Sequence, residues 1–235
     1  MSRRVVRFVA VVPALFALVF AGACKGGDDG DGGKRAGGPD ATATLRQSAQ
    51  AMGAVQSVAL ALSTEDKPQI PVRGGDIKLL KSGDAEGTIQ LAQAGQTVEM
   101  NLVALGDAFY IKAVTGGWRK LPKAMAATMY DPSAVLDPQR GISKLLTSVS
   151  GAKTEATEEV AGKDAHRIAV TLPREALGDL VPGINQDVPG KVWVSAADHR
   201  LLRVRGDLPA EGGGKASVTI DFTEFDKPYQ IAAPA

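Results

Sequence analysis

The sequence has little of the chemistry that marks an active or metal-binding site. It contains one cysteine and two histidines in 235 residues, which excludes an intrachain disulfide and leaves few ligands for a transition metal. Aromatic residues make up 5% of the chain, so any apolar interior is mainly aliphatic. Lys and Arg number 27 against 26 Asp and Glu, and this balance excludes the basic surface that a nucleic-acid-binding protein needs.

No catalytic motif is present either. His166 lies in phase with core residues of an expected strand, and His199 lies in a turn-like segment. The acidic residues Asp28, Asp29 and Asp31 lie among glycines, which is typical of a solvated charge run. Nucleophile elbows, phosphate-binding loops and dinucleotide fingerprints are missing. We therefore predict a protein that is not an enzyme, with no catalytic residue, metal or cofactor.

The first 23 residues are typical of a secretory signal peptide. A basic start with three arginines precedes the apolar run 8–20, which is too short to span a membrane. Its removal takes the formal net charge from +1 to −2. We therefore expect an exported protein.

The residues around Cys24 permit two interpretations of the same cleaved bond. Ala21-Gly22-Ala23-Cys24 resembles the lipobox of bacterial lipoproteins, although Ala21 replaces the usual Leu, and it also fits ordinary secretory cleavage. Acylation of Cys24 would give a lipid anchor on the outer face of the cell membrane. Residues 25–39 contain seven glycines, so 24–39 is expected to be a flexible tether with a reach of about 20 Å.

The remaining chain, 40–235, is expected to be one domain built mostly of strands. Apolar and polar residues alternate from Gly87 to Ala113, with turns at Gly95-Gln96 and Gly106-Asp107. Similar runs elsewhere give about ten strands, including a polar edge strand at 152–160. Short turns between such strands predict an antiparallel sheet with one apolar face.

Helices are expected in two main places. Asp40 is a plausible N-cap for a helix that ends at about 53–56. Asp131-Pro132 and Asp137-Pro138 are each expected to begin a helix, the second with an apolar stripe over 142–149.

This count of elements predicts an incompletely covered apolar face. A helix about 10 Å wide covers about two strands spaced 4.8 Å apart, so the sheet must either curl onto itself or enclose a cavity. The residues that we expect to line a lipid-binding cavity are Val58, Leu60, Ile89, Leu91, Val98, Met100, Leu102, Phe109, Ile111, Ile142, Leu145 and Leu146. The alternative is a packed interior in a non-enzymatic envelope interaction or sensing module.

Four segments resemble the LppX/LprAFG lipoprotein family of actinobacteria. They are QTVEMNLVALGDAFYIKAVTGGWRKL at 96–121, YDPSAVLDPQRGISKLL at 130–146, VPGKVWVSAADHRLLRVRGDLP at 188–209 and VTIDFTEFDKPYQIAAP at 218–234. The signal segment, Cys24 and the glycine-rich tether also match. The resemblance covers nearly all of 40–235.

The resemblance implies an α+β single domain. In it, a strongly curved antiparallel half-barrel is closed by helices around a large hydrophobic cavity, as in LolA/LolB carriers. It also implies an acylated lipid, glycolipid or lipoglycan ligand, transfer of that ligand to the outer cell envelope, and a membrane lipid exporter as a further partner.

Overall fold

The computed structural model describes residues 38–113, 115–126, 131–178, 180–181 and 183–235. The predicted signal peptide 1–23, the predicted lipidation site Cys24 and the predicted tether as far as residue 37 lie outside the described residues.

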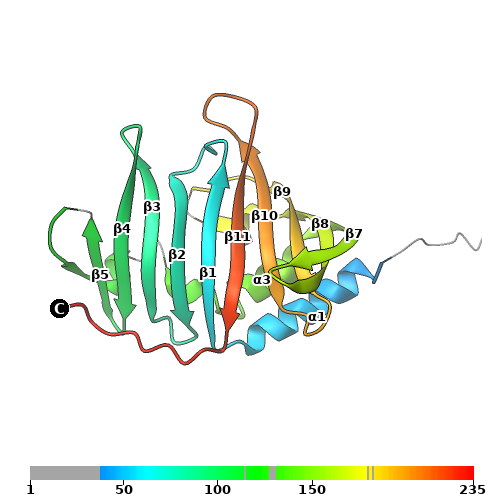
Figure 1. Cartoon of the computed structure of the whole chain (residues 1–235), viewed down its shortest axis with the longest axis horizontal. Helices are drawn as coiled ribbons and strands as arrows, with labels where there is room; N and C mark the ends of the chain where they lie inside the picture. The colour runs from blue at the N-terminus through cyan, green and yellow to red at the C-terminus, as the bar shows by residue number, and fades with distance from the viewer. Residues whose placement is uncertain (1–37, 114, 127–130, 179, 182) are drawn as a thin grey trace, which may run out of the picture. The chain divides into compact units, whose positions relative to one another are not determined.

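The described strands form one antiparallel sheet of eleven strands, in the order β6-β5-β4-β3-β2-β1-β11-β10-β9-β8-β7 (Figure 1). The first six are β1 Ser57–Glu65, β2 Val72–Leu80, β3 Ala85–Gln93, β4 Gln96–Leu105, β5 Ala108–Ala113 and β6 Arg119–Pro122. The other five are β7 Ser150–Val160, β8 Lys163–Leu172, β9 Val188–Ser195, β10 Leu201–Pro209 and β11 Lys215–Phe225. In the described chain β6 and β7 end the sheet and do not pair with each other, so the half-barrel is open, as predicted.

The two strands at the ends of the sheet, β7 and β6, differ in how well the sequence predicted them. Strand β7, with its alternating exposed residues, is an edge strand as expected. The short strand β6 was not predicted, because Arg119, Lys120 and Pro122 leave only Leu121 to mark an apolar face.

Helix α1, Ala41–Ala54, agrees with the sequence prediction at both ends. The Asp40 side chain accepts a hydrogen bond from the Ala43 N–H at 2.6 Å, which satisfies a donor at the start of the helix. The other helices are α2 Lys123–Ala126, the 3₁₀ helix η1 Pro132–Ala134, α3 Ile142–Ser148 and α4 Arg174–Gly178.

The two Asp-Pro pairs have different outcomes. Asp131 caps η1 as expected, and its side chain accepts from the Ser133 N–H at 3.0 Å. The expected helix start at Asp137-Pro138 is wrong, since α3 begins at Ile142 with Gly141 as its N-cap. Asp137 instead accepts from the Gln139 N–H at 2.7 Å, and this bond closes a turn before the helix.

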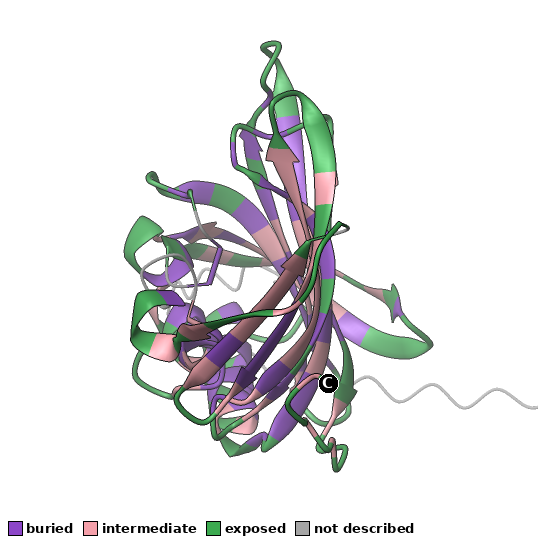
Figure 2. Cartoon of the chain, turned by 90° about the vertical axis from the view of Figure 1, so that its left-hand side faces the viewer, coloured by how far each residue is buried: buried purple, intermediate pink, exposed green. Residues whose placement is uncertain are grey.

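The register places the predicted sheet residues on one face. Leu60 lies opposite Ile77, Ile89 lies opposite Met100, and Leu102 lies opposite Ile111. The same face continues into β11 and β10 through Phe222 and Val204. Figure 2 shows the sheet bent around the helices, with buried residues gathered on the helix side. The opposite side of the sheet is called the outer face below.

Gly87 marks a very close approach of β3 to β2. A Cβ atom on this residue would lie 2.1 Å from the Asp76 carbonyl oxygen and 2.7 Å from the Ile77 Cα. Because these are backbone atoms of a paired strand, they cannot move aside without breaking the register.

We therefore expect Gly87→Ala to lower the free energy of unfolding by about 1–3 kcal/mol through overpacking. Urea denaturation measures this change. Gly117→Ala is the matched control, because a Cβ there meets no atom within 4 Å. Equal stability of the two variants would contradict the close approach.

Candidate functional site: an apolar cavity between sheet and helices

An apolar cavity of about 40 Å³ lies between the sheet and helices α3 and α4. Its wall carries almost no polar surface. The residues that line it are Leu60, Leu62, Val72, Gly74, Gly75, Ile77, Ile89, Val135, Ile142, Leu145, Leu177, Leu180, Val204, Ile220 and Phe222. Its volume holds about three water molecules, whereas occupied ligand sites measure roughly 300–1,000 Å³.

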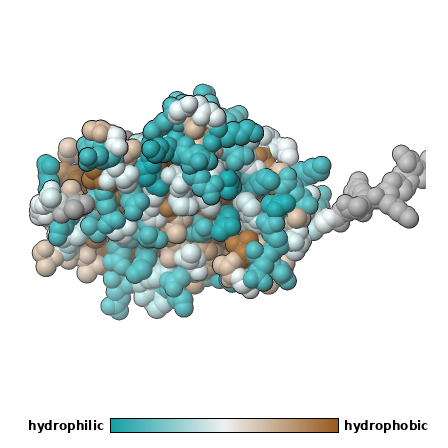
Figure 3. All heavy atoms as spheres, turned by 45° about the horizontal axis from the view of Figure 1, so that its top comes forward, coloured by the Kyte–Doolittle hydropathy of each residue, from teal (hydrophilic) through white to brown (hydrophobic). Residues whose placement is uncertain are grey.

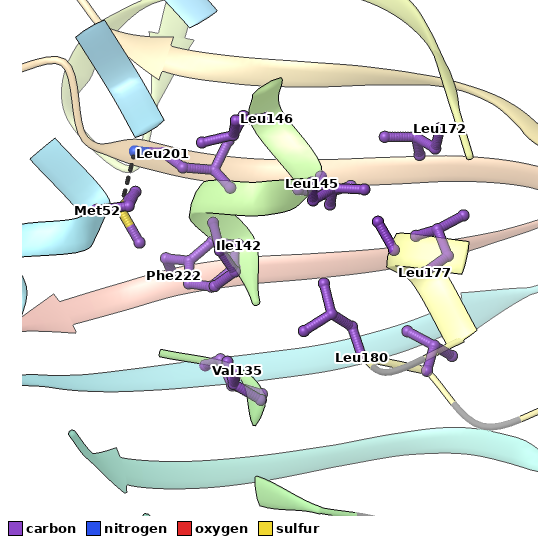
Figure 4. Packing of buried hydrophobic residues seen from close by; sticks show 14 of the residues in the cluster. Met52, Val135, Ile142, Leu145, Leu146, Leu172, Leu177, Leu180, Leu201 and Phe222 are labelled. Carbon is purple, nitrogen blue, oxygen red and sulfur yellow. Dashed lines mark hydrogen bonds between the residues drawn. The ribbon is translucent and has the colours of Figure 1, made fainter. Parts of the chain in front are cut away.

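The helix side of the cavity is built from short elements. Ile142 and Leu145 face the cavity from one stripe of α3, and Leu177 and Leu180 come from α4 and the turn after it (Figure 4). All four side chains are at least nine-tenths buried. The structure thus has an apolar cavity on the predicted face, but at about 40 Å³ it is much smaller than the large cavity that was expected.

The sheet side has a floor of small residues. Gly74 and Gly75 line the cavity beside Val72 on β2. Residue 75 lies directly opposite Ile89 on β3 and leaves the space that a side chain would take. This floor was not predicted, because two glycines in a strand are most readily interpreted as a turn or bulge.

The predicted lining residues separate into three groups. Leu60, Ile89, Ile142 and Leu145 line the cavity. Val58, Leu102, Phe109 and Leu146 are buried in the surrounding hydrophobic core, and Leu91 and Ile111 pack against it half-buried. Val98 and Met100 are half-buried on the same face, beyond that core.

Several lining residues were absent from the prediction. The first strand, β1, pairs with the last strand, β11, and β11 pairs with β10. This pairing brings Ile220 and Phe222 of β11 and Val204 of β10 to the cavity. Their alternation was visible in the sequence, but the pairing of the first strand with the last was not. Val135 reaches the cavity from the loop before α3.

That loop is braced by one cation. Arg140 contacts the carboxylate of Asp131 at 3.3 Å and that of Asp137 at 3.2 Å. Burial alone would raise the pKa of Asp131, but hydrogen bonds from Ser133 and Arg140 outweigh it and hold this pKa below its ordinary value. The Gln139 N–H and Arg140 likewise lower the pKa of Asp137. Val135 lies between these two carboxylates in the chain and lines the cavity.

Acid is expected to loosen this loop. Because both carboxyl pKa values are lower in the folded chain, their contribution to stability is complete above about pH 4 and is lost as the pH falls through the folded values. Arg140→Gln removes the shared cation and should cost less than about 1 kcal/mol at neutral pH. Melting temperatures from pH 6 to 3 should fall more for the original chain than for the variant, and parallel pH profiles would contradict the brace.

The two histidines lie away from the cavity. His166 Nδ1 lies 2.9 Å from the Thr157 hydroxyl near the β7 edge of the sheet, and His199 lies in the turn between β9 and β10 with a positive φ of 57°. In the described part of the chain, no group of three His, Cys, Asp or Glu side chains is placed to hold a metal ion. Among the helices described, none has the length and hydropathy needed to cross a membrane.

Together, the open half-barrel and its apolar cavity place the protein among domains that enclose an apolar cavity between a curved sheet and helices. Residues 40–231 match the LppX_LprAFG lipoprotein family, and the chain belongs to that family. The lipoarabinomannan carrier protein LprG of Mycolicibacterium smegmatis is 31% identical over 202 residues, which cover 84% of each chain. LprG of Mycobacterium tuberculosis is 28% identical over 244 residues, covering 99% of this chain and 97% of the relative. These relatives are named as carriers, in agreement with the prediction that the protein is not an enzyme.

Solved structures share the fold. LprF from Mycobacterium bovis superimposes with a TM-score of 0.72 at 18% identity, covering 85% of this chain and 99% of LprF. The lipoprotein LppX from Mycobacterium tuberculosis gives a TM-score of 0.60 at 22% identity, covering 81% of this chain and 97% of LppX. The predicted fold class is therefore confirmed.

Proposed function

We propose that this protein is an exported lipoprotein that binds the acyl chains of a lipid or lipoglycan and carries them toward the outer cell envelope. The observation that carries the proposal is an apolar cavity with almost no polar surface in a member of this lipoprotein family. Relatives named as lipoarabinomannan carriers support an acylated lipoglycan as the ligand class.

Binding an acyl chain requires the cavity to widen. At about 40 Å³ the cavity is much smaller than a ligand site, so α3 or α4 must move away from the sheet. The same face offers a continuation, because Leu91, Val98, Met100 and Ile111 lie half-buried on β3–β5 next to Ile89. A chain that entered along these residues would find an apolar path into the cavity.

The energy available for this opening is large. Each methylene removed from water contributes about 0.8 kcal/mol, so a dozen contribute about 10 kcal/mol before losses. This contribution needs no polar anchor, which agrees with the apolar wall of the cavity.

The small cavity also favours a second candidate function. A domain with this packed interior could serve as a non-enzymatic interaction or sensing module in the envelope. Mass spectrometry of lipids that co-purify with the mature protein from its own host separates the two functions. Stoichiometric acylated lipid is expected for a carrier, and its absence after repeated gentle purification would favour the interaction module.

We propose further that Cys24 carries the lipid anchor and that a membrane lipid exporter supplies the ligand. Replacement Cys24→Ser removes the acylation site and should move the protein from the membrane fraction to the soluble extracytoplasmic fraction. Immunoblotting of the two fractions measures this shift. Equal partitioning of both forms would contradict the anchor.

A further inference from the structure

A second concavity lies on the outer face of the sheet, on the side opposite to the apolar cavity. It is an open groove of about 550 Å³. Its outer-face walls come from β1–β4, from β11 and from the segment before β6, and they include Asp76, Thr88, Asn101, Val103 and Trp118. We call this the outer groove. Unlike the apolar cavity, it combines polar and apolar side chains and is large enough for a ligand.

The polar groups of the outer groove have spare hydrogen-bonding capacity. Among the described residues, the side chains of Asp76, Thr88 and Asn101 have no hydrogen-bond or ion-pair partner. Thr88 and Asn101 lie on neighbouring strands directly opposite each other and are both half-buried. A half-buried amide and hydroxyl side by side offer donors and acceptors together, the combination that recognises a sugar hydroxyl.

Trp118 adds an aromatic surface to this set. Its side chain is half-buried in the wall of the groove, and no described residue accepts a hydrogen bond from its indole N–H. A half-buried indole beside unused amide, hydroxyl and carboxylate groups suits a flat ligand with apolar C–H faces and polar edges. Figure 3 shows a mainly hydrophilic surface with small separated hydrophobic groups on the face that it draws.

We infer that the outer groove binds the glycan part of the acylated lipoglycan whose acyl chains the apolar cavity would hold. This inference rests on the proposed function. Relatives named as carriers of a lipoglycan support it. The groove is lined by three acidic residues, Asp76, Glu86 and Glu224, and by Lys78, which pairs with Glu86 at 3.3 Å. A neutral sugar therefore fits better than a phosphate.

The sheet topology allows one ligand to reach both faces. Met100 lies on the cavity face of β4, and Asn101, the next residue, lies on the outer face. Only β5 and the four-residue strand β6 separate β4 from the end of the sheet, a width of about 10 Å. Trp118 directly precedes β6, so it lies near the route of a glycan that passes around this edge.

The two tryptophans allow a direct test with deacylated lipoarabinomannan as the probe. Trp193 is 6% exposed and donates to Glu158 at 2.6 Å, whereas Trp118 lies in the groove wall. Adding the soluble glycan should shift the intrinsic tryptophan fluorescence of the mature chain. The shift should disappear in Trp118→Phe, which retains Trp193 as a signal from the folded domain.

Titration calorimetry with the same probe measures how much the polar side chains of the outer groove contribute to the glycan affinity. Asn101→Ala should weaken glycan binding about tenfold, the loss expected for a hydrogen-bonded amide. Gln96→Ala is the matched control, because Gln96 is an exposed amide at the start of the same strand and does not line the groove. Its glycan affinity should remain unchanged.

Two results would overturn the glycan site: no binding of the deacylated glycan, or equal binding by the Asn101→Ala, Trp118→Ala and original chains. A fluorescent long-chain fatty acid, added in parallel, tests the apolar cavity alone. Ile89→Trp should lose the fatty acid and keep the glycan, and Asn101→Ala should show the reverse. Glycan binding without any fatty-acid binding would contradict the proposed lipid carriage while supporting the outer groove.

Discussion

Ile89→Trp is expected to reduce the affinity for an acylated lipid by about 100-fold or more. The indole would occupy the part of the apolar cavity above Gly75, which lies opposite Ile89. Excluding about four methylenes from the cavity removes roughly 3 kcal/mol of binding free energy. Because Ile89 is only half-buried, the cost in stability should be near the lower end of the 1–3 kcal/mol that overpacking causes.

Displacement of a fluorescent fatty acid measures this loss, and circular dichroism confirms that the variant is folded. Glu99→Trp is the control, because Glu99 is exposed and precedes Met100 on the same strand, with its side chain on the outer face. It introduces the same side chain without filling the cavity. If both variants bind lipid as well as the original chain, the acyl chain does not enter beside Ile89.

Leu145→Ala is expected to lower the free energy of unfolding by about 2–5 kcal/mol. Leu145 is 1% exposed and lines the cavity from α3. Its truncation also widens the cavity, so a bound acyl chain should restore part of the lost stability. At a ligand concentration of 100 times the Kd, binding to the folded state adds about 2.7 kcal/mol.

Leu146→Ala is the matched control for this prediction. Leu146 is also 1% exposed and lies on the same helix, but it does not line the cavity. Figure 4 shows it on the side of α3 near Leu201 and Met52. Its truncation should destabilise the domain as much as Leu145→Ala does, with no additional lipid rescue. Equal rescue of both variants would contradict a specific role for the cavity wall.

The local pattern of the sequence predicted most of the elements. Alternation between Gly87 and Ala113 became strands β3, β4 and β5, and Asp40 became the N-cap of α1. The wrong helix start at Asp137-Pro138 has a local cause, since an Asp-Pro pair fits a turn as well as a helix N-terminus. The structure has a turn there because Gly141 and Ile142 hydrogen-bond back to Asp137 and Val135.

The candidate site could be predicted only in part. All the predicted strand residues lie on the cavity face, because a period of two fixes which side chains share a face of a strand. The pattern could not distinguish Leu60, which lines the cavity, from Val58, which is buried in the core two residues earlier. That distinction depends on where α3 and α4 lie over the sheet.

Local patterns of residues account for the alternation, the apolar face, the first helix and the resemblance to a lipoprotein family. The small volume of the cavity, its glycine floor, the contribution of β10 and β11 and the position of Trp118 in the outer groove became clear only from the folded chain. The two groups of features differ in the range of the interactions that set them. Side-chain alternation follows from neighbouring residues, whereas a cavity is set by contacts between segments as distant as β1 and β11, which no local pattern encodes.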